Sequence, residues 1–233
     1  MLSAQGFQKA FEYWRLFLQG AVCTISLSAL TVLFGFMLAL VLAIARLGKV
    51  RVFKYLAAAY VELFRATPMV VQVFIIYYVV FDGVKVLPGF KLFGFIRFER
   101  FFPAVVALAL NSGAYLSEII RSGIQSIDGG QTEAARSLGL SAWKTMRFVV
   151  LPQAIKNILP AIANEFVTII KESAICYTIG VQDIMSAVNA VKGATYKIGE
   201  ALIIATALYF CLTYPTSKII AHFERKMSVG DKR

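Results

Sequence analysis

Polar and ionisable side chains recur within otherwise apolar stretches of the sequence, at spacings that bring them to one face of a helix. Glu118 follows Asn111 by seven residues and Glu172 follows Glu165 by seven, which returns each pair to nearly the same side of an α-helix. Such faces could line a cavity for a zwitterion, whose ammonium group needs acceptors and whose carboxylate needs donors. The candidate substrate-binding residues are Arg65, Thr67, Gln72, Asn111, Ser112, Tyr115, Glu118, Glu165, Lys171 and Glu172.

The same charges could instead hold helices together. Glu62 lies three residues before Arg65, and Glu118 lies three residues before Arg121, so each pair can form a salt bridge along one helix. Pro68 interrupts the helical hydrogen-bond ladder beside the first pair, and freed backbone groups can bind a ligand where they face a cavity. The sequence leaves open which charges pair with one another and which face a ligand.

Three other candidates also have alternative roles. Tyr115 could contribute packing alone, and Lys171 and Glu172, near the end of their apolar stretch, could act at a gate or in a helix–helix pair. Asn111, Glu118 and Glu165 lie deeper in their stretches, where a polar group needs a partner or a pathway. Depth therefore makes these three candidates to face a ligand.

Catalytic constellations are not apparent in the sequence. The single histidine, His222, lies near the end of an apolar stretch, and the GxSxG, HExxH and GxxxxGK[ST] motifs do not occur. Cys23, Cys176 and Cys211 lack the spacing of a metal site or a disulfide framework, so we expect them to pack as small apolar residues. We expect neither an enzyme nor a metal centre in this chain.

Composition indicates that these side chains are positioned by membrane helices. The 233 residues are 59% apolar and 16% charged, and the mean hydropathy is +0.72. Soluble domains are about 45–50% apolar and about 25% charged. These values exclude a disordered or soluble globular protein. The net charge of +11 does not indicate a nucleic-acid partner, because no basic block is interleaved with aromatic residues in a polar context.

Five stretches are long and apolar enough to cross a bilayer as helices, which requires about 20 residues. They cover residues 17–45, 55–81, 102–127, 158–179 and 200–221. Lys and Arg number 13 in the loops and tail on the C-terminal side and 8 on the other side, Lys85 among the latter. The excess places the N-terminus outside and the C-terminus inside. The predicted fold class is an all-α membrane protein with five transmembrane helices.

The chain divides into an N-terminal segment, a membrane domain and a tail. Phe7, Phe11 and Trp14 recur at helical spacing, which predicts a short interfacial helix in segment 1–16. A plain extension of the first span would give the same pattern. We expect no cleaved signal peptide, because a basic segment followed by a short apolar one is missing. Residues 17–222 form the membrane domain and 223–233 a cytoplasmic tail.

The predicted cytoplasmic loop 128–156 is long and has helical character of its own. Strong helix formers occupy 131–138, and Gly139 can supply the left-handed residue that ends this helix. Ser141 can cap a second short helix, which Pro152 is expected to interrupt. The loop is therefore predicted to be an ordered surface.

Residues of this loop resemble the EAA loop of importer permeases in the ATP-binding cassette (ABC) superfamily. Glu133-Ala134-Ala135 is followed by three residues, Gly139, nine residues, Val149, one residue and then Leu151-Pro152, and Val149 stands where the family usually has Ile. The resemblance implies that the first short helix docks in a groove of a cytoplasmic ATPase and transmits its closing motion. It assigns ATPase coupling to Glu133, Ala134, Ala135 and Gly139. A helix-turn-helix for DNA is disfavoured by the adjoining apolar spans.

A second resemblance points to the polar amino acid branch of these permeases. Residues 62–72 read ELFRATPMVVQ, similar to the ELFRGTPLLVQ of that branch with Ala66 replacing Gly, and residues 111–121 and 164–173 also fit it. The resemblance implies a MetI-like ABC permease fold and import of a polar amino acid across the bacterial cell membrane. It further implies a second permease, identical or sister, two ATPase subunits and an extracytoplasmic binding protein. ATP and Mg²⁺ would be bound by the ATPase, with no cofactor in this chain.

Two other classes of membrane protein compete with this interpretation. A secondary transporter would depend on an ion gradient and usually shows an internal repeat, which the sequence lacks. A membrane scaffold or receptor subunit would leave the intramembrane charges unexplained unless all of them were structural pairs. The amino acid itself stays open, because the charges in the spans permit a cationic, neutral or acidic side chain.

Overall fold

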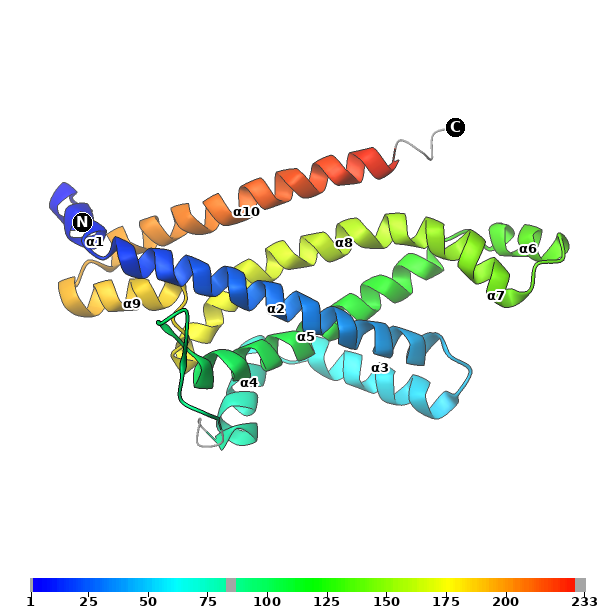
Figure 1. Cartoon of the computed structure of the whole chain (residues 1–233), viewed down its shortest axis with the longest axis horizontal. Helices are drawn as coiled ribbons and strands as arrows, with labels where there is room; N and C mark the ends of the chain where they lie inside the picture. The colour runs from blue at the N-terminus through cyan, green and yellow to red at the C-terminus, as the bar shows by residue number, and fades with distance from the viewer. Residues whose placement is uncertain (1, 83–86, 229–233) are drawn as a thin grey trace.

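The computed structural model describes residues 2–82 and 87–228, which are almost entirely helical (Figure 1). Three helices are each long and apolar enough to cross a membrane alone: α2 (Trp14–Leu47), α5 (Phe98–Gln125) and α10 (Ile198–Ser228). Two bent helix pairs are also apolar enough, which gives five candidate spans if each pair counts as one. The predicted all-helical membrane fold is confirmed at this level, and the exact number of crossings stays a prediction.

The predicted span 55–81 consists of two helices that meet at a sharp elbow. Helix α3 (Arg51–Ala66) is followed by α4 (Met69–Phe74), which continues into the π-helical turn η1 (Ile75–Val80), and the two arms are bent by 108°. Thr67 is extended, with φ −111° and ψ 146°, as expected for a residue that precedes proline. The predicted interruption at Pro68 therefore redirects the chain instead of merely kinking one helix.

The fourth predicted span begins earlier than the sequence suggested. Helix α7 (Ala142–Thr145) runs through the π-helical turn η3 (Met146–Val150) into α8 (Leu151–Glu172) without a break, so the predicted interruption at Pro152 is wrong. The backbone N–H of Leu151 bonds to Met146 in the wider π register, and Pro152 occupies the first turn of α8. The π-helical turn widens the helix directly before Pro152, so the proline is accommodated without ending the helix.

Beyond α8 the chain changes direction again. The short 3₁₀ helix η4 (Ser173–Ile179) ends at Gly180 and leads to α9 (Ile184–Thr195), at a bend of 47°. An antiparallel hairpin, β1 (Lys91–Leu92) and β2 (Ile96–Arg97), precedes α5. Lys85, counted in the topology prediction, lies outside the described residues.

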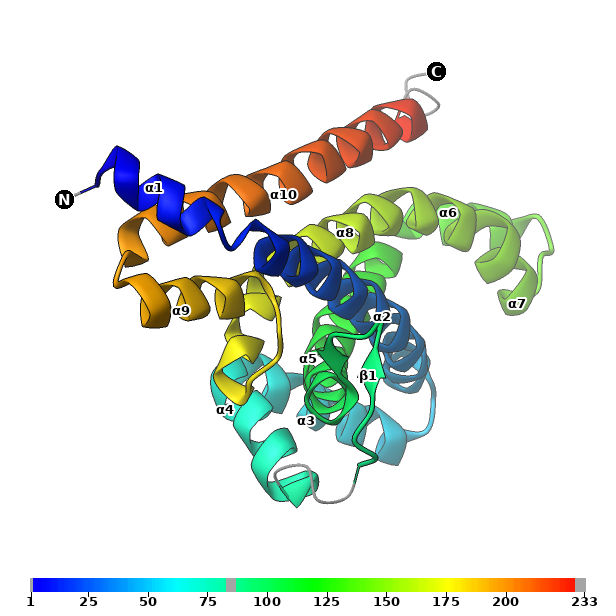
Figure 2. The same cartoon turned by 60° about the vertical axis from the view of Figure 1, so that its left-hand side comes forward.

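Helices α2 and α5 pack along each other and form the centre of the molecule (Figures 1 and 2). Small residues permit this close approach: a Cβ on Gly113 would lie 2.7 Å from the Leu38 side chain, and one on Gly35 would lie 3.1 Å from Ser112. One core cluster joins Leu27 of α2 to Leu108 of α5. Close packing of small residues is typical of helix pairs in membranes.

Helix α1 (Ala4–Phe11) and the last turns of α10 lie at opposite ends of the molecule in both views (Figures 1 and 2). Helix α1 is separate from α2, and α6 (Gly129–Ser137) lies with α7 at the end that carries the C-terminal part of α10. If the chain crosses the membrane an odd number of times, its first and last helices must end on opposite sides, as they do here. The inside and outside assignment and the interfacial position of segment 1–16 stay predictions, and residues 229–233 of the predicted tail lie outside the described residues.

Candidate functional site

Two buried amides, Gln72 of α4 and Asn111 of α5, close the elbow between α3 and α4. The Gln72 Nε2 donates to the Phe64 carbonyl at 2.8 Å and to the Thr67 carbonyl at 3.1 Å. The Asn111 Nδ2 donates to the Gln72 Oε1 at 2.8 Å and to the Phe64 carbonyl at 3.3 Å. These carbonyls lie at the end of α3, where the break at Pro68 removes their helical partners. The amides therefore bond the backbone of the elbow.

The hydroxyl of Thr67 belongs to the same network. It donates to the Leu63 carbonyl at 2.8 Å and accepts from the Gln72 Nε2 at 2.7 Å. A cavity of about 220 Å³ lies beside it, and its lining is apolar apart from Thr67 and Gln72. An apolar lining suits a hydrocarbon group better than a zwitterion. Three predicted ligand residues, Thr67, Gln72 and Asn111, thus have their polar groups bonded within the chain.

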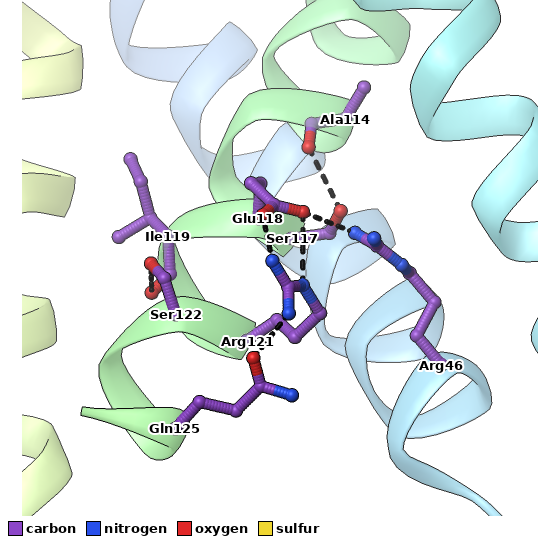
Figure 3. A network of polar contacts seen from close by, with 8 residues as sticks. All are labelled: Arg46, Ala114, Ser117, Glu118, Ile119, Arg121, Ser122 and Gln125. Carbon is purple, nitrogen blue, oxygen red and sulfur yellow. Dashed lines mark hydrogen bonds and ion pairs between the residues drawn. The ribbon is translucent and has the colours of Figure 1, made fainter. Parts of the chain in front are cut away.

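Glu118 lies in an ion-pair network that joins the ends of α2 and α5 (Figure 3). The Arg46 Nη1 is 2.5 Å from the Glu118 Oε2. The Arg121 Nε donates to the same oxygen at 3.1 Å, and the Arg121 Nη2 bonds the other carboxylate oxygen. Arg121 also donates to Gln125. Both carboxylate oxygens of Glu118 are thus bound by guanidinium groups. The structure therefore forms the salt bridge between Glu118 and Arg121 that the sequence offered as the alternative to ligand binding.

Glu165 of α8 is a predicted acidic residue that has no cationic partner among the described residues. The Ser112 Oγ donates to the Glu165 Oε1 at 3.4 Å, and no ion pair to Glu165 occurs among the described residues. Glu165 is half-buried and is close enough to Glu172 for the two carboxylates to interact electrostatically. Glu172 and its neighbour Lys171 are both exposed. The α5–α8 contact therefore presents two carboxylates, one of them held by a hydroxyl.

Arg65 of α3 is a predicted basic residue that approaches α5 one turn away from Ser112. Its guanidinium carbon lies 5.5 Å from the centre of the Tyr115 ring, a cation–π distance. The alternative salt bridge between Glu62 and Arg65 does not form in the described part of the chain. Tyr115 is 39% exposed and follows Ser112 by three residues, so the two lie on one face of α5. Arg65 and Glu165 thus contact neighbouring positions of the same helix.

The candidate coupling residues lie on α6, at one end of the molecule. Gly139 has φ +85° and its N–H donates to the Arg136 carbonyl at 3.0 Å, which confirms it as the left-handed residue that ends this helix. The Asp128 side chain caps the start of α6, and the Ser141 side chain caps α7. Glu133 and Ala134 are exposed, whereas Ala135 is buried against its own chain.

Two apolar side chains beside α6 were not assigned a role from the sequence. Leu138 is 84% exposed and Trp143 is 66% exposed. Large apolar side chains exposed together are typical of protein–protein contact sites. The sequence signal that could have found them is their position between helix caps in a segment predicted to lie outside the membrane.

Residues 12–229 match the family described as "Binding-protein-dependent transport system inner membrane component". The chain belongs to this family, whose members are the permease components of ABC transporters and not the ATP-hydrolysing subunits. It is thus an inner-membrane protein, and the family membership favours an ATP-driven importer over a secondary transporter or a scaffold.

Among its relatives is the arginine transport system permease protein ArtQ of Bacillus subtilis, 42% identical over 92% of this chain and 93% of the relative. A crystal structure of an amino acid ABC transporter with histidines has a TM-score of 0.87 and 39% identity, and the match covers 97% of this chain and 100% of that one. The MetNI methionine ABC transporter in an inward-facing conformation has a TM-score of 0.70 at 18% identity, covering 91% and 96% of the two chains. The predicted MetI-like permease fold is confirmed.

Proposed function

We propose that this chain is the permease subunit through which an ABC importer moves a polar amino acid with a cationic side chain. The observation that carries the proposal is the α5–α8 face, where Glu165 accepts from Ser112 and has no cationic partner among the described residues. Glu165 and Glu172 can accept from an α-ammonium group and a cationic side chain, and Arg65 can bind the α-carboxylate. An arginine transporter among the relatives supports the same class of substrate.

A second permease subunit, either an identical copy or a sister chain, would cover this face. Arg65 and Glu172 are exposed in the single chain although both lie in predicted spans. A charge that faces lipid is costly, so these groups need a partner or a water-filled path. The proposed pathway therefore runs between two permease subunits, and Lys171 lies at its outer gate.

Helix α6 would connect this pathway to the ATPase. The exposed Glu133 and Ala134, together with Leu138 and Trp143, offer a surface for a groove on that subunit, which binds ATP and Mg²⁺. Closure of the ATPases would displace α6 and the adjoining α7. Because α7 continues through η3 into α8 without a break, this displacement would reorient the helix that carries Glu165. A binding protein would deliver the amino acid at the opposite end, which is extracytoplasmic in this orientation.

The binding of arginine to the purified permease–ATPase complex tests the proposed site. We expect measurable binding of radiolabelled arginine, weakened about 10-fold or more by Glu165→Gln, because a hydrogen bond to a charged group contributes about 1.5–3 kcal/mol. Glu12→Gln is the matched control, since Glu12 is an exposed acid at the other end of the chain. Equal binding by wild type and Glu165→Gln, or a preference for glutamate over arginine, would refute the proposed site.

A further inference from the structure

A strongly basic surface lies where the first membrane helix turns back, and the transport pathway does not use it. We define the α2–α3 corner as residues 47–56, from the end of α2 through the first turns of α3. All ten residues are exposed. The corner lies at the same end of the molecule as α6 and the C-terminal part of α10 (Figure 1).

The charge of the corner is entirely positive. Lys49, Arg51 and Lys54 form no ion pair with any described residue, and no Asp or Glu occurs between Glu12 and Glu62 in the sequence. Glu118 lies on α5, which packs against α2, but its carboxylate is already paired with Arg46 and Arg121 (Figure 3). The three basic side chains of the corner are therefore available to an anionic partner from outside the chain.

Large apolar side chains alternate with these charges. Val52 is 65% exposed, Phe53 is 61% exposed and Tyr55 is 69% exposed. The corner directly follows the apolar helix α2, so it lies at the level where a bilayer ends. There, apolar side chains enter the acyl region while the long stems of Lys and Arg carry their charges to the phosphate groups.

We propose that the α2–α3 corner binds the phosphate-bearing headgroup of an anionic membrane lipid through Lys49, Arg51 and Lys54. Arg51 and Lys54 lie three residues apart on α3, so they share one face, and Lys49 approaches from the preceding turn. Phe53 and Tyr55 anchor the corner beside the bound headgroup. An acidic surface of a protein partner would satisfy the charges but would leave these apolar side chains without a matching environment.

Native mass spectrometry of the detergent-purified full chain, titrated with dioleoylphosphatidylglycerol or dioleoylphosphatidylcholine, tests the proposal. Wild type should bind the anionic lipid more tightly than the zwitterionic one. The variant K49Q/R51Q/K54Q should lose this preference, since each basic residue near an anionic surface changes affinity by about fivefold. The matched control K91Q/R97Q/K192Q removes two exposed lysines and one arginine at the opposite end of the molecule and should keep the preference.

Three outcomes would overturn the proposal. The first is equal binding of the two lipids by wild type, and the second is an unchanged preference in K49Q/R51Q/K54Q. The third is displacement of the anionic lipid by soluble glycerol 3-phosphate at equal concentration, which would indicate a site for a free phosphate. Variants are compared only where their thermal unfolding matches that of wild type.

Discussion

The hydroxyl of Ser112 donates to the carboxylate of Glu165 at 3.4 Å and so joins α5 to α8 at a charge that no described cation neutralises. Ser112 is buried beside Gly35 of α2, where an added Cβ would lie 3.1 Å from it. The donor is therefore held by a close contact between the two central helices. The position of the Glu165 carboxylate depends on this packing.

Ser112→Ala should weaken substrate transport without abolishing it. The change removes one hydrogen bond to a carboxylate at the long end of the normal range, so we expect the KM for arginine uptake to rise about two- to tenfold. The measurement is uptake by proteoliposomes that contain the full transporter. In a Glu165→Ala background the same change should have almost no further effect, because the acceptor of this hydrogen bond is already absent. Independent, additive effects would show that the two residues act separately.

The contact between Arg65 and Tyr115 predicts a difference between two substitutions of the tyrosine. Tyr115→Phe keeps an aromatic face for the guanidinium and should retain arginine uptake within about twofold, whereas Tyr115→Ala should lose several-fold, as expected for a cation–π contact of about 0.5–2 kcal/mol. Michaelis–Menten analysis of arginine uptake by Tyr115→Phe and Tyr115→Ala measures this difference. Equal losses in both variants would instead assign the role to the Tyr115 hydroxyl.

Asn111→Ala should destabilise the protein more than it affects substrate affinity. The substitution leaves the Gln72 Oε1 and the Phe64 carbonyl without the Asn111 donor in a buried setting, at a cost of about 1–3 kcal/mol. Thermal unfolding in detergent measures this loss. Asn157→Ala is the control, because Asn157 makes one exposed hydrogen bond to Ser126. Normal stability together with lost arginine binding would show that Asn111 contacts the substrate.

The pair of Arg46 and Glu118 should show energetic coupling in a double-mutant cycle. Their side chains are 15% and 21% exposed, so the pair is partly desolvated. Glu118→Ala leaves Arg46 without its partner, whereas Arg46→Ala leaves Glu118 with Arg121 alone. We expect each single variant to lose about 1–3 kcal/mol of unfolding free energy and the double variant to lose less than their sum. Chemical unfolding in mixed micelles provides the values. Strict additivity would argue against a stabilising ion pair.

Local signals in the sequence predicted the coupling segment well. The cap at Ser141 and the left-handed Gly139 depend on residues within one helical turn, so a short stretch of sequence contains the necessary information. The interruption at Pro68 was predicted for the same reason. The π-helical turn before Pro152 was not, because wide-register hydrogen bonds have no simple sequence signature.

Contacts between distant segments could not be predicted in the same way. Helical periodicity placed Glu118 and Arg121 on one face, but it could not identify Arg46, which is 72 residues away in the sequence and reaches Glu118 only through the packing of α2 on α5. Similarly, periodicity marked Gln72 and Asn111 as polar positions in apolar stretches. Their partners became apparent only once the 108° elbow brought α4 against α5.

The most direct test of the central claim is arginine uptake by proteoliposomes that contain this chain, its ATPase and its binding protein, with ATP as the only energy source. Glu133→Lys alters the exposed face of α6, and Gln131→Lys alters an exposed position two residues away. We predict ATP-dependent uptake by wild type and by Gln131→Lys, and loss of uptake with retained arginine binding in Glu133→Lys. Uptake by this chain alone, driven by an ion gradient and unaffected by either substitution, would contradict the account.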